Sequence, residues 1–348
     1  MSLRVAICAA QVPFVRGGAE VLYTSLRAEL ERRGHRVEIV ALPFSWSSRQ
    51  RILESALAWR LVDLTEAAGE RIDLVVATRF PSYAVAHPAK VVWLVHQFRQ
   101  IYELAGTRWS DFGERPGDDG VAVMLRELDQ RTLGEARARF AISRNTAERL
   151  RAHNGLDAEP LYPPPLLGER YRSGPAGDYV FTVGRLDAMK RFDLLVRALA
   201  HTRQPVRAVI AGEGPEGEAL RALAGELGVA DRVELPGRVD DERLIALYAG
   251  ALAVFYAPFD EDYGYVTVEA FRSGRAVVTA ADSGGVLEFV HDGENGFVCA
   301  AGSVREIARR LDDLWDDRAG ALRLGRAGAE RVAGIGWDVV VERLLSGL

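Results

Sequence analysis

The chain has 348 residues, of which 48% are hydrophobic and 27% are charged, and its formal net charge is −5. Such a chain is globular with an ample core, and its length favours two domains over one. A mildly acidic chain without basic clusters argues against nucleic acid as a partner. The two cysteines, Cys8 and Cys299, lack the spacing of a zinc site or a disulfide framework.

The first residues carry no targeting pattern. The apolar run over residues 5–10 is too short to span a bilayer and lacks the cleavage-site pattern of a signal peptide. We therefore expect a cytoplasmic protein.

The first half of the chain alternates strand and helix signals. Buried strands are expected over residues 4–10, 36–41, 73–78, 90–95 and 139–143, and helices over residues 19–33 and 144–153. This β-α-β order predicts a parallel sheet covered by helices. A glycine pair, Gly17 and Gly18, ends the loop over residues 11–18, where it can aim free N–H groups at an anion or simply form a turn.

Residues 47–66 carry leucines at helical spacing together with three arginines, so they predict an amphipathic helix. Packing on the sheet explains this pattern. The arginines also leave open a peripheral contact of the N-terminal domain with the inner face of an anionic membrane.

His96 directly follows the expected strand over residues 90–95. Groups just past the carboxyl end of a central strand face the ligand crevice of an open α/β sheet, so His96 is a candidate ligand-positioning residue. A hydrogen-bonded surface histidine is the alternative. The expected loop over residues 106–120 contains Trp109 and Phe112, which could stack on a sugar or pack under their own loop.

A stretch rich in proline and glycine divides the chain. We place an N-terminal domain at residues 1–165, a linker at 166–178, a C-terminal domain at 179–335 and a final helix at 336–348. Helices punctuated by Gly320, Gly334 and Gly336 are expected from residue 304 onward.

The second half begins with a strand over residues 179–183, followed by Gly184, Arg185 and, five residues later, Lys190, before a helix over residues 191–200. Two cations at the carboxyl end of a strand can straddle a diphosphate, with arginine as a bidentate fork and lysine as a point charge. Lysine occurs only twice in the chain, which adds weight to Lys190.

Residues 212–217 satisfy the pattern GxGxxG after a strand over residues 208–211. The pattern suggests a dinucleotide site, but it does not lie in the first βα unit of a domain. Pro215 also removes one N–H from the helix start, and Glu213 would face a pyrophosphate. We therefore do not assign a dinucleotide here. A strand over residues 233–236 and a helix over residues 242–250 follow.

An acidic turn follows the expected strand over residues 251–256 and precedes a helix over residues 266–271. Backbone N–H groups at that helix start, next to Gly264, suit a phosphate, and Glu269 can point back to the same crevice. Carboxylates beside a phosphate site make sense where they bind hydroxyl groups. Glu261 and Glu269 therefore indicate a nucleotide-sugar.

This region, with Gly264 between the two glutamates and Ser283-Gly284-Gly285 and Asp292-Gly293 downstream, resembles the E-x7-E region of family-four retaining glycosyltransferases, the glycosyl transferases group 1. The resemblance implies an α/β protein of GT-B fold, with two Rossmann-like β/α/β domains facing a central cleft. It also implies that Glu261 contacts the donor sugar, Glu269 the ribose, and the backbone of Gly264, Tyr265 and Val266 the diphosphate.

The resemblance extends to other motifs and to the last helix, which it expects to cross back onto the N-terminal domain. It implies a pyrophosphate clamp at Gly184, Arg185 and Lys190, and a glycine-rich loop over the diphosphate at Gly17 and Gly18. His96 would lie near the donor sugar, the segment of Gly212 near the nucleotide, and the backbone at Arg238 near the base.

The sequence thus predicts a glycosyltransferase of polysaccharide or glycoconjugate synthesis. It would move a sugar from a nucleotide-sugar, with UDP or GDP favoured, to a glycan, lipid-linked or small-molecule acceptor, without metal or cofactor. Retention of the anomeric configuration is implied by the resemblance alone. His96, Arg185, Lys190 and Glu261 are the predicted catalytic residues. A nucleotide-sugar epimerase, a dinucleotide-dependent enzyme and a non-catalytic nucleotide-sugar-binding protein remain alternatives.

Overall fold

The computed structural model of the chain describes residues 2–14 and 17–346. The chain forms two compact units, unit 1 from Met1–Leu166 with Gly336–Leu348 and unit 2 from Leu167–Ile335. Parts of two predicted elements lie outside the described residues, namely residues 15 and 16 of the loop over residues 11–18 and residues 347 and 348 of the last helix.

Unit 1 is built on a parallel sheet in which the described strands follow the order β2-β1-β5-β6-β7-β8. These strands are β1 (Arg4–Gln11), β2 (Arg36–Pro43), β5 (Leu74–Ala77), β6 (Lys90–Leu94), β7 (Ala138–Ala141) and β8 (Glu159–Pro160). A short antiparallel hairpin, β3 (Glu66–Ala67) and β4 (Glu70–Arg71), is separate from the sheet.

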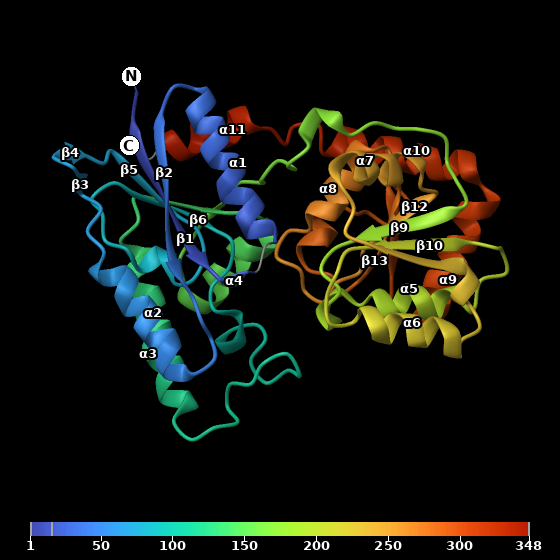
Figure 1. The fold of residues 1–348 in the computed structure, drawn as a ribbon, viewed down its shortest axis with the longest axis horizontal. Coiled ribbons are helices and arrows are strands. Elements are labelled where there is room, and N and C mark those ends of the chain that lie inside the picture. The colour runs from blue at the N-terminus through green and yellow to red at the C-terminus, as the bar shows by residue number, and fades with distance from the viewer. Residues whose placement is uncertain (1, 15–16, 347–348) are drawn as a thin grey trace. The chain divides into compact units, whose positions relative to one another are not determined.

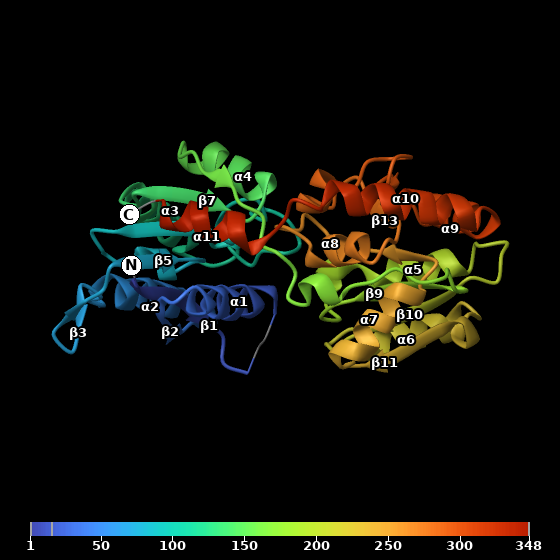
Figure 2. The same cartoon turned by 90° about the horizontal axis from the view of Figure 1, so that it is seen from above.

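Helices cover both faces of the unit 1 sheet. They are α1 (Gly18–Arg32), α2 (Arg49–Leu61), α3 (Asp118–Gly134), α4 (Arg144–Asn154) and α11 (Trp337–Leu345). Helices α1 and α11 lie side by side (Figure 1, Figure 2), while α2 packs with α3. Alternate residues of β1, Ala6, Cys8 and Ala10, are buried with apolar residues of α2 and α3, as the two-residue repeat of a strand requires.

Two predicted boundaries in unit 1 are wrong. Helix α2 ends at Leu61, five residues before the predicted end, because Val62 turns to an extended conformation. Helix α3 begins at Asp118, inside the predicted loop over residues 106–120. The Asp118 carboxylate accepts hydrogen bonds from the backbone N–H groups of Gly113 and Arg115 and pairs with Arg49, so a distant partner fixes this start.

Unit 2 is a second parallel sheet, with its described strands in the order β11-β10-β9-β12-β13-β14. The strands are β9 (Tyr179–Val183), β10 (Arg207–Ala211), β11 (Val233–Gly237), β12 (Ala253–Phe255), β13 (Val277–Ala280) and β14 (Gly296–Cys299). In chain order this is 3-2-1-4-5-6, the doubly wound order of dinucleotide-binding folds. The predicted α/β class is therefore confirmed.

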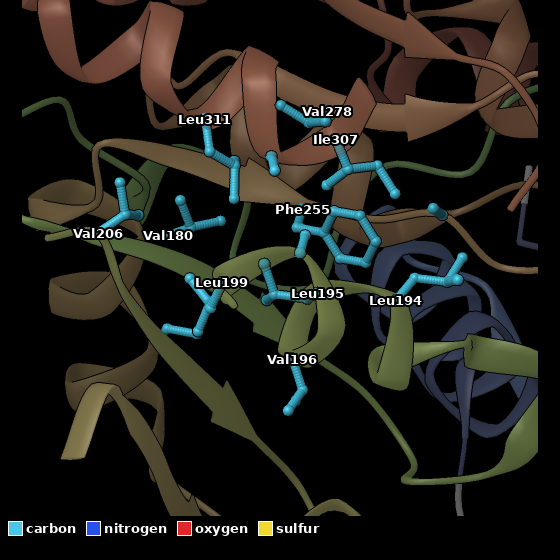
Figure 3. Close-up of a cluster of buried hydrophobic side chains, with 14 of the residues drawn as sticks. Val180, Leu194, Leu195, Val196, Leu199, Val206, Phe255, Val278, Ile307 and Leu311 are labelled. Atoms are coloured by element: carbon cyan, nitrogen blue, oxygen red, sulfur yellow. The ribbon is translucent and has the colours of Figure 1, made fainter. Parts of the chain in front are cut away.

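The unit 2 helices are α5 (Phe192–Leu199), α6 (Gly217–Glu226), α7 (Asp241–Gly250), α8 (Tyr265–Arg272), α9 (Val304–Asp316) and α10 (Arg318–Arg331). Helix α5 packs with α6 and α9, and α8 packs with α10 (Figure 1). Leu195 of α5, Phe255 of β12, and Ile307 and Leu311 of α9 gather in one buried apolar cluster (Figure 3). This cluster makes the sheet a rigid base for the loops at its carboxyl edge.

The C-terminal helices differ in one place from the sequence prediction. Gly334 and Gly336 lie between α10 and α11 as expected, but Gly320 lies inside α10. The Asp317 carboxylate accepts a hydrogen bond from the Gly320 N–H at 2.7 Å, so this aspartate caps a helix that starts at Arg318, two residues before the glycine. Within the described ranges, every helix falls short of the length and hydrophobicity that a membrane span requires.

Candidate functional site

Three loops of unit 2 meet at the carboxyl edge of its sheet. They follow β9, β12 and β13, and the last leads into the 3₁₀ helix η6 (Gly285–Glu288). Strands β9 and β12 are neighbours where the strand order reverses, so this edge is the place where open α/β sheets bind ligands. Backbone hydrogen bonds join the loops: Phe259 N–H donates to Met189 O, and Asp260 N–H to Asp282 O, both at 2.8 Å.

Lys190 and Glu261 form a charged pair at this edge. The Asp187 carboxylate accepts a hydrogen bond from the Lys190 backbone N–H at 3.2 Å and so fixes the turn. The Lys190 Nζ donates to Glu261 Oε2 at 2.5 Å and to the Tyr256 hydroxyl at 3.2 Å. The two charged side chains are only 22% and 21% exposed. Burial, the largest single influence, lowers the pKa of Lys190, but the charges and hydrogen bonds of Glu261 and Tyr256 together outweigh it and raise that pKa overall.

Arg185, the second predicted cation, follows Gly184 at the end of β9 and is exposed. Within residues 2–14 and 17–346 its side chain makes no ion pair or hydrogen bond. The structure therefore does not bring Arg185 into contact with Lys190 or Glu261, and leaves its guanidinium open to a ligand.

The start of α8 has the geometry of an anion site. Gly264 has a φ of +87°, and a Cβ there would lie 2.9 Å from Val286 Cγ2 and 3.1 Å from Tyr256 Cε1, so only glycine fits. Tyr265 and Val266 are the first two residues of the helix. Their N–H groups have no partner within the helix and lie at the positive end of its dipole, so they suit a phosphate.

Glu269 lies one turn further along α8 and is held by tyrosines. The Tyr248 hydroxyl, from α7, donates to Glu269 Oε2 at 2.7 Å. The Tyr171 ring packs edge-on against Tyr248, and its buried hydroxyl makes no hydrogen bond of ordinary geometry in the described chain. Burial raises the pKa of Glu269, and the hydroxyls of Tyr248 and Tyr171 lower it only in part. Glu269 is thus a fixed acceptor, separate from the Lys190–Glu261 pair.

The glycine-rich turn after β10 serves close packing of two loops. A Cβ on Gly212, where φ is +124°, would lie 1.9 Å from Gly184 O, and one on Gly214 would lie 2.4 Å from Leu186 O. Leu186 N–H also donates to Glu213 O at 3.0 Å. The GxGxxG pattern follows β10, the second strand of unit 2 in chain order. Close packing against the loop after β9 accounts for its first two glycines.

This packing predicts a large effect of one methyl group. Gly212→Ala should destabilise unit 2 by about 3 kcal/mol or more, because backbone at φ +124° must hold a side chain against a carbonyl oxygen. Gly225→Ala is the matched control, since Gly225 is exposed in α6 with nothing within 4 Å of an added Cβ. It should stabilise the chain by about 0.5–1 kcal/mol. Urea unfolding of both variants measures the difference, and equal effects would contradict the packing argument.

Arg238 lies just past Gly237 at the end of the edge strand β11 and is exposed. Its side chain makes no hydrogen bond or ion pair with the described residues, and nothing joins it to Lys190 or Glu261. Asp240 caps α7 by accepting a hydrogen bond from Arg243 N–H at 2.8 Å, which explains the neighbouring acidic residues without a ligand.

In unit 1, the predicted phosphate-binding glycines lie at the start of α1. Gly17 N–H donates to Glu20 Oε2 at 2.8 Å, so a carboxylate of the protein already occupies that donor. The other oxygen, Oε1, accepts from Arg79 Nη2 at 2.9 Å and from the Tyr23 hydroxyl at 3.1 Å. An anion at Gly17 would have to displace Glu20, while Gly18, the first residue of the helix, has an N–H without an intrahelical partner.

His96 directly follows β6 and is half-buried. Its Nδ1 lies 2.7 Å from Gln97 O, so Nδ1 carries a proton and donates to that carbonyl. Gln97 is buried and donates through Nε2 to Asn154 Oδ1 at 2.5 Å. The backbone next to His96 is therefore anchored.

A buried carboxyl group supports the segment that follows His96. Asp129 of α3 is fully buried and accepts hydrogen bonds from the hydroxyls of Tyr83 and Tyr102, each at 2.8 Å. Burial raises the pKa of Asp129 to about 7, and the tyrosine hydroxyls lower it only in part.

Asp129 should make stability depend on pH. The folded carboxyl keeps its proton to about pH 7, whereas the unfolded one loses it near 3.8, so the folded state binds more protons between these values. The free energy of unfolding should therefore fall as pH rises through this window. Asp129→Asn should remove this part of the pH dependence. Urea unfolding at pH 5 and pH 8 checks it, and an equal pH effect in both proteins would contradict the assignment.

Several residues at this edge are not marked as site residues by any pattern in the sequence. Tyr256 was expected only as the end of a strand, and Tyr248 only as part of a helix. Arg191 and Asp282 form an ion pair across 91 residues of sequence, which spacing does not reveal. In the described ranges, no group of three or more His, Cys, Asp or Glu side chains is arranged to hold a metal ion.

Comparison with solved structures shows the fold. Sucrose-phosphate synthase from Thermosynechococcus elongatus matches with a TM-score of 0.80 at 18% identity, covering 99% of this chain and 98% of that one. HepE of Anabaena, solved with UDP and glucose, matches with a TM-score of 0.71 at 19% identity, covering 99% and 100%. These GT-B neighbours confirm the predicted architecture class.

Curated relatives are more similar in sequence. D-inositol 3-phosphate glycosyltransferase of Nocardia farcinica is 31% identical over 297 residues, covering 78% of this chain and 65% of the relative. The enzyme of the same name from Mycolicibacterium smegmatis is 34% identical over 239 residues, covering 65% and 54%. The chain thus spans less than two thirds of the length of these relatives.

Two family models match consecutive parts of the chain. Residues 16–162 match Glycosyltransferase Family 4, and residues 170–331 match Glycosyl transferases group 1. Together they cover the unit 2 sheet with its charged edge and all of the unit 1 sheet except β1. The chain therefore belongs to the glycosyltransferase family that these two models describe, as the E-x7-E region and the turn with Gly184, Arg185 and Lys190 predicted.

Proposed function

We propose that the chain transfers a sugar from a nucleotide-sugar to a hydroxyl group of a glycan, a lipid-linked or a small-molecule acceptor. The observation that carries this proposal is the contact of Lys190 with Glu261 at the switch point of the unit 2 sheet. A cation and a hydroxyl-accepting carboxylate side by side match a ligand that joins a diphosphate to a sugar.

Each residue of this edge has a proposed role. Lys190 and Arg185 stabilise the diphosphate, and the amides of Tyr265 and Val266 bind one of its phosphates. Glu261 accepts hydrogen bonds from the sugar hydroxyls, and Glu269, held by Tyr248, accepts them from the ribose.

Six positions outside this contact have proposed roles as well. The segments of Gly184 and Gly212, which pack against each other, lie near the nucleotide in this proposal, and Arg238 lies toward the base. In unit 1, His96 and the N–H groups of Gly17 and Gly18 are proposed ligand contacts.

The transfer breaks the bond from the anomeric carbon to the diphosphate and forms one from that carbon to an acceptor oxygen, with release of the hydroxyl proton. The nucleoside diphosphate leaves with the electron pair, so negative charge grows on its bridging oxygen. Fixed cations next to that oxygen stabilise the transition state more than the ground state.

The proposed donor is a sugar linked to UDP or GDP. HepE, which shares the fold at 19% identity, was solved with UDP and glucose. Between the two proposed nucleotides, this neighbour favours UDP. We propose retention of configuration from the family resemblance, and independence of metal from the positive charge that Lys190 and Arg185 supply. Activity in excess EDTA and the anomeric proton coupling of the product test these two points.

A thermal-shift panel tests the function first. UDP-glucose, GDP-mannose, ADP-glucose and CDP-glucose are added without metal, and a ligand that binds only the native state raises Tm. We expect one to shift Tm and to release its nucleoside diphosphate during turnover. Binding without release would indicate a non-catalytic binding protein. A shift of Tm with NAD(H) alone would indicate a dinucleotide-dependent enzyme. Epimerisation of the sugar while it stays attached to its nucleotide would indicate an epimerase.

A peripheral membrane contact through α2 also belongs to the proposal. Leu57 and Leu61 are exposed on α2, and Arg51 is 67% exposed. Arg60, however, donates to both oxygens of Glu135 and offers little charge to lipid. Sedimentation with vesicles of phosphatidylserine and phosphatidylcholine tests the contact, and Leu61→Ser should weaken it.

A further inference from the structure

Arg191, the residue after Lys190, has an unusual backbone conformation. Its φ is 52° and its ψ is 39°, in the left-handed region where a side chain other than glycine is disfavoured. The residue is nevertheless an arginine that is only 9% exposed. A disfavoured backbone and a buried cation at one position require strong compensating contacts.

The Arg191 guanidinium supplies those contacts to two other loops. Its Nε donates to Ala257 O at 2.7 Å and its Nη2 to Pro258 O at 2.9 Å, both in the loop after β12. Both Nη atoms also donate to the two carboxylate oxygens of Asp282, in the loop after β13, each at 2.7 Å. One side chain therefore ties the three loops at the carboxyl edge together through four hydrogen bonds.

The same loops carry the charged pair. Lys190 immediately precedes Arg191 in the first loop, and Glu261 follows Pro258 by three residues in the second. The third loop supports the second through its backbone, since Asp282 O accepts from Asp260 N–H at 2.8 Å and Ser283 O from Glu261 N–H at 3.2 Å. The separation of Lys190 from Glu261 therefore depends on how Arg191 holds these loops.

We propose that Arg191 and Asp282 are positioning residues that set the Lys190–Glu261 geometry for the diphosphate and sugar of the donor. This inference rests on the proposed function. Neither residue contacts the reacting atoms in it, because four of the five N–H donors of the guanidinium already bond protein oxygens. They act through Lys190, whose displacement by about 1 Å can cost a large factor in rate.

Arginine is required for this role. A lysine has one nitrogen and cannot bond a carboxylate bidentately and two carbonyls at once, so Arg191→Lys should not preserve the geometry. Arg191→Gly removes the side chain but accepts the left-handed backbone without strain, so it isolates the loss of the contacts. Asp282→Asn keeps the shape and removes the charge, and serves if the glycine variant does not fold.

A double-mutant cycle with Lys190 tests the proposal. kcat and KM are measured with the donor that the panel selects, beginning with UDP-glucose, and UDP binding is measured by calorimetry. Arg191→Gly and Asp282→Asn should each lower kcat/KM at least about tenfold in the wild-type background. In the Lys190→Ala background the same changes should have less than about a threefold effect, because the residue through which they act is already gone.

The control is a second arginine–aspartate pair in the same helix region. Arg197 and Asp193 pair at 3.4 Å on the exposed face of α5, and Arg197→Ala should leave kcat/KM unchanged. Equal losses from Arg191→Gly in both backgrounds would show a structural role only and overturn the inference. Unchanged kcat/KM in both Arg191→Gly and Asp282→Asn would do the same. If the wild-type chain binds and turns over none of the panel, the proposed function itself fails, and the positioning role of Arg191 and Asp282 falls with it.

Discussion

Replacing Lys190 with alanine is expected to lower kcat about 10²–10³-fold while the chain remains folded. The lysine is the cation nearest to Glu261, and its removal withdraws positive charge from the proposed diphosphate site. The apolar cluster of unit 2 does not include Lys190, so far-UV circular dichroism should match that of the wild type.

Lys190→Arg is the matched variant for charge. It keeps the positive charge but changes a compact ammonium to a planar fork, so we expect activity between that of the wild type and Lys190→Ala. Release of nucleoside diphosphate from the selected donor gives kcat for all three proteins. Near-normal turnover of Lys190→Ala would refute the assignment of Lys190 to the leaving group.

The other lysine should matter for stability instead. Lys90→Met is expected to lower the free energy of unfolding by about 3–5 kcal/mol, the cost of breaking a buried charged network. Lys90 is fully buried, and its Nζ donates to Thr132 O at 2.8 Å, Val85 O at 2.9 Å and Tyr83 O at 3.2 Å. Burial lowers the pKa of Lys90. The three carbonyl oxygens around Nζ stabilise the positive charge of the buried lysine.

Glu135→Gln separates the carbonyl contacts from the ion pair. Glu135 lies 3.4 Å from Lys90 Nζ and is 32% exposed, so its loss should cost less than about 1 kcal/mol. Urea unfolding followed by tryptophan fluorescence measures both variants, and UDP binding should be unchanged because Lys90 is not among the proposed ligand contacts and its Nζ bonds carbonyls of the protein. A small loss in Lys90→Met would contradict a structural role for the lysine.

The two lysines show what sequence reasoning can and cannot supply. The rarity of lysine in this chain draws attention to Lys190, but the same argument applies to Lys90, which packs among carbonyls in unit 1. Composition cannot separate a ligand-facing cation from a buried one. The neighbouring pattern can: Lys190 follows a strand end and a glycine-arginine pair, while Lys90 begins a strand.

The parallel strands were predictable because strands buried on both faces appear as apolar runs, and β9 lies over the predicted residues 179–183. Strands β13 and β14 and helix α3 escaped assignment. Helix α3 starts where Asp118 meets Arg49, a contact across 69 residues that no local pattern encodes. The GT-B family was predictable because the motif spacing around Glu261 and Glu269 is local.

Contacts between distant loops were not predictable. Both Lys190 and Glu261 were singled out, but not that they touch, because their meeting depends on β9 and β12 becoming neighbours. Likewise, Gly17 was expected to offer its N–H to a phosphate, and Glu20 is bonded to it in this structure. Only the three-dimensional structure shows that the Glu20 carboxylate competes with a phosphate for this N–H group.

The pairing of Lys190 with Glu261 also bears on selectivity among the many phosphorylated compounds of a cell. A nucleoside triphosphate or inorganic pyrophosphate draws Lys190 away from Glu261 and offers that carboxylate only like charge in exchange. A nucleotide-sugar offers phosphate oxygens to the lysine and hydroxyl donors to the glutamate together. In the proposed function, the Lys190–Glu261 contact therefore acts as an internal competitor that a compound with both groups displaces at least cost, which would favour the proposed donor over free nucleotides.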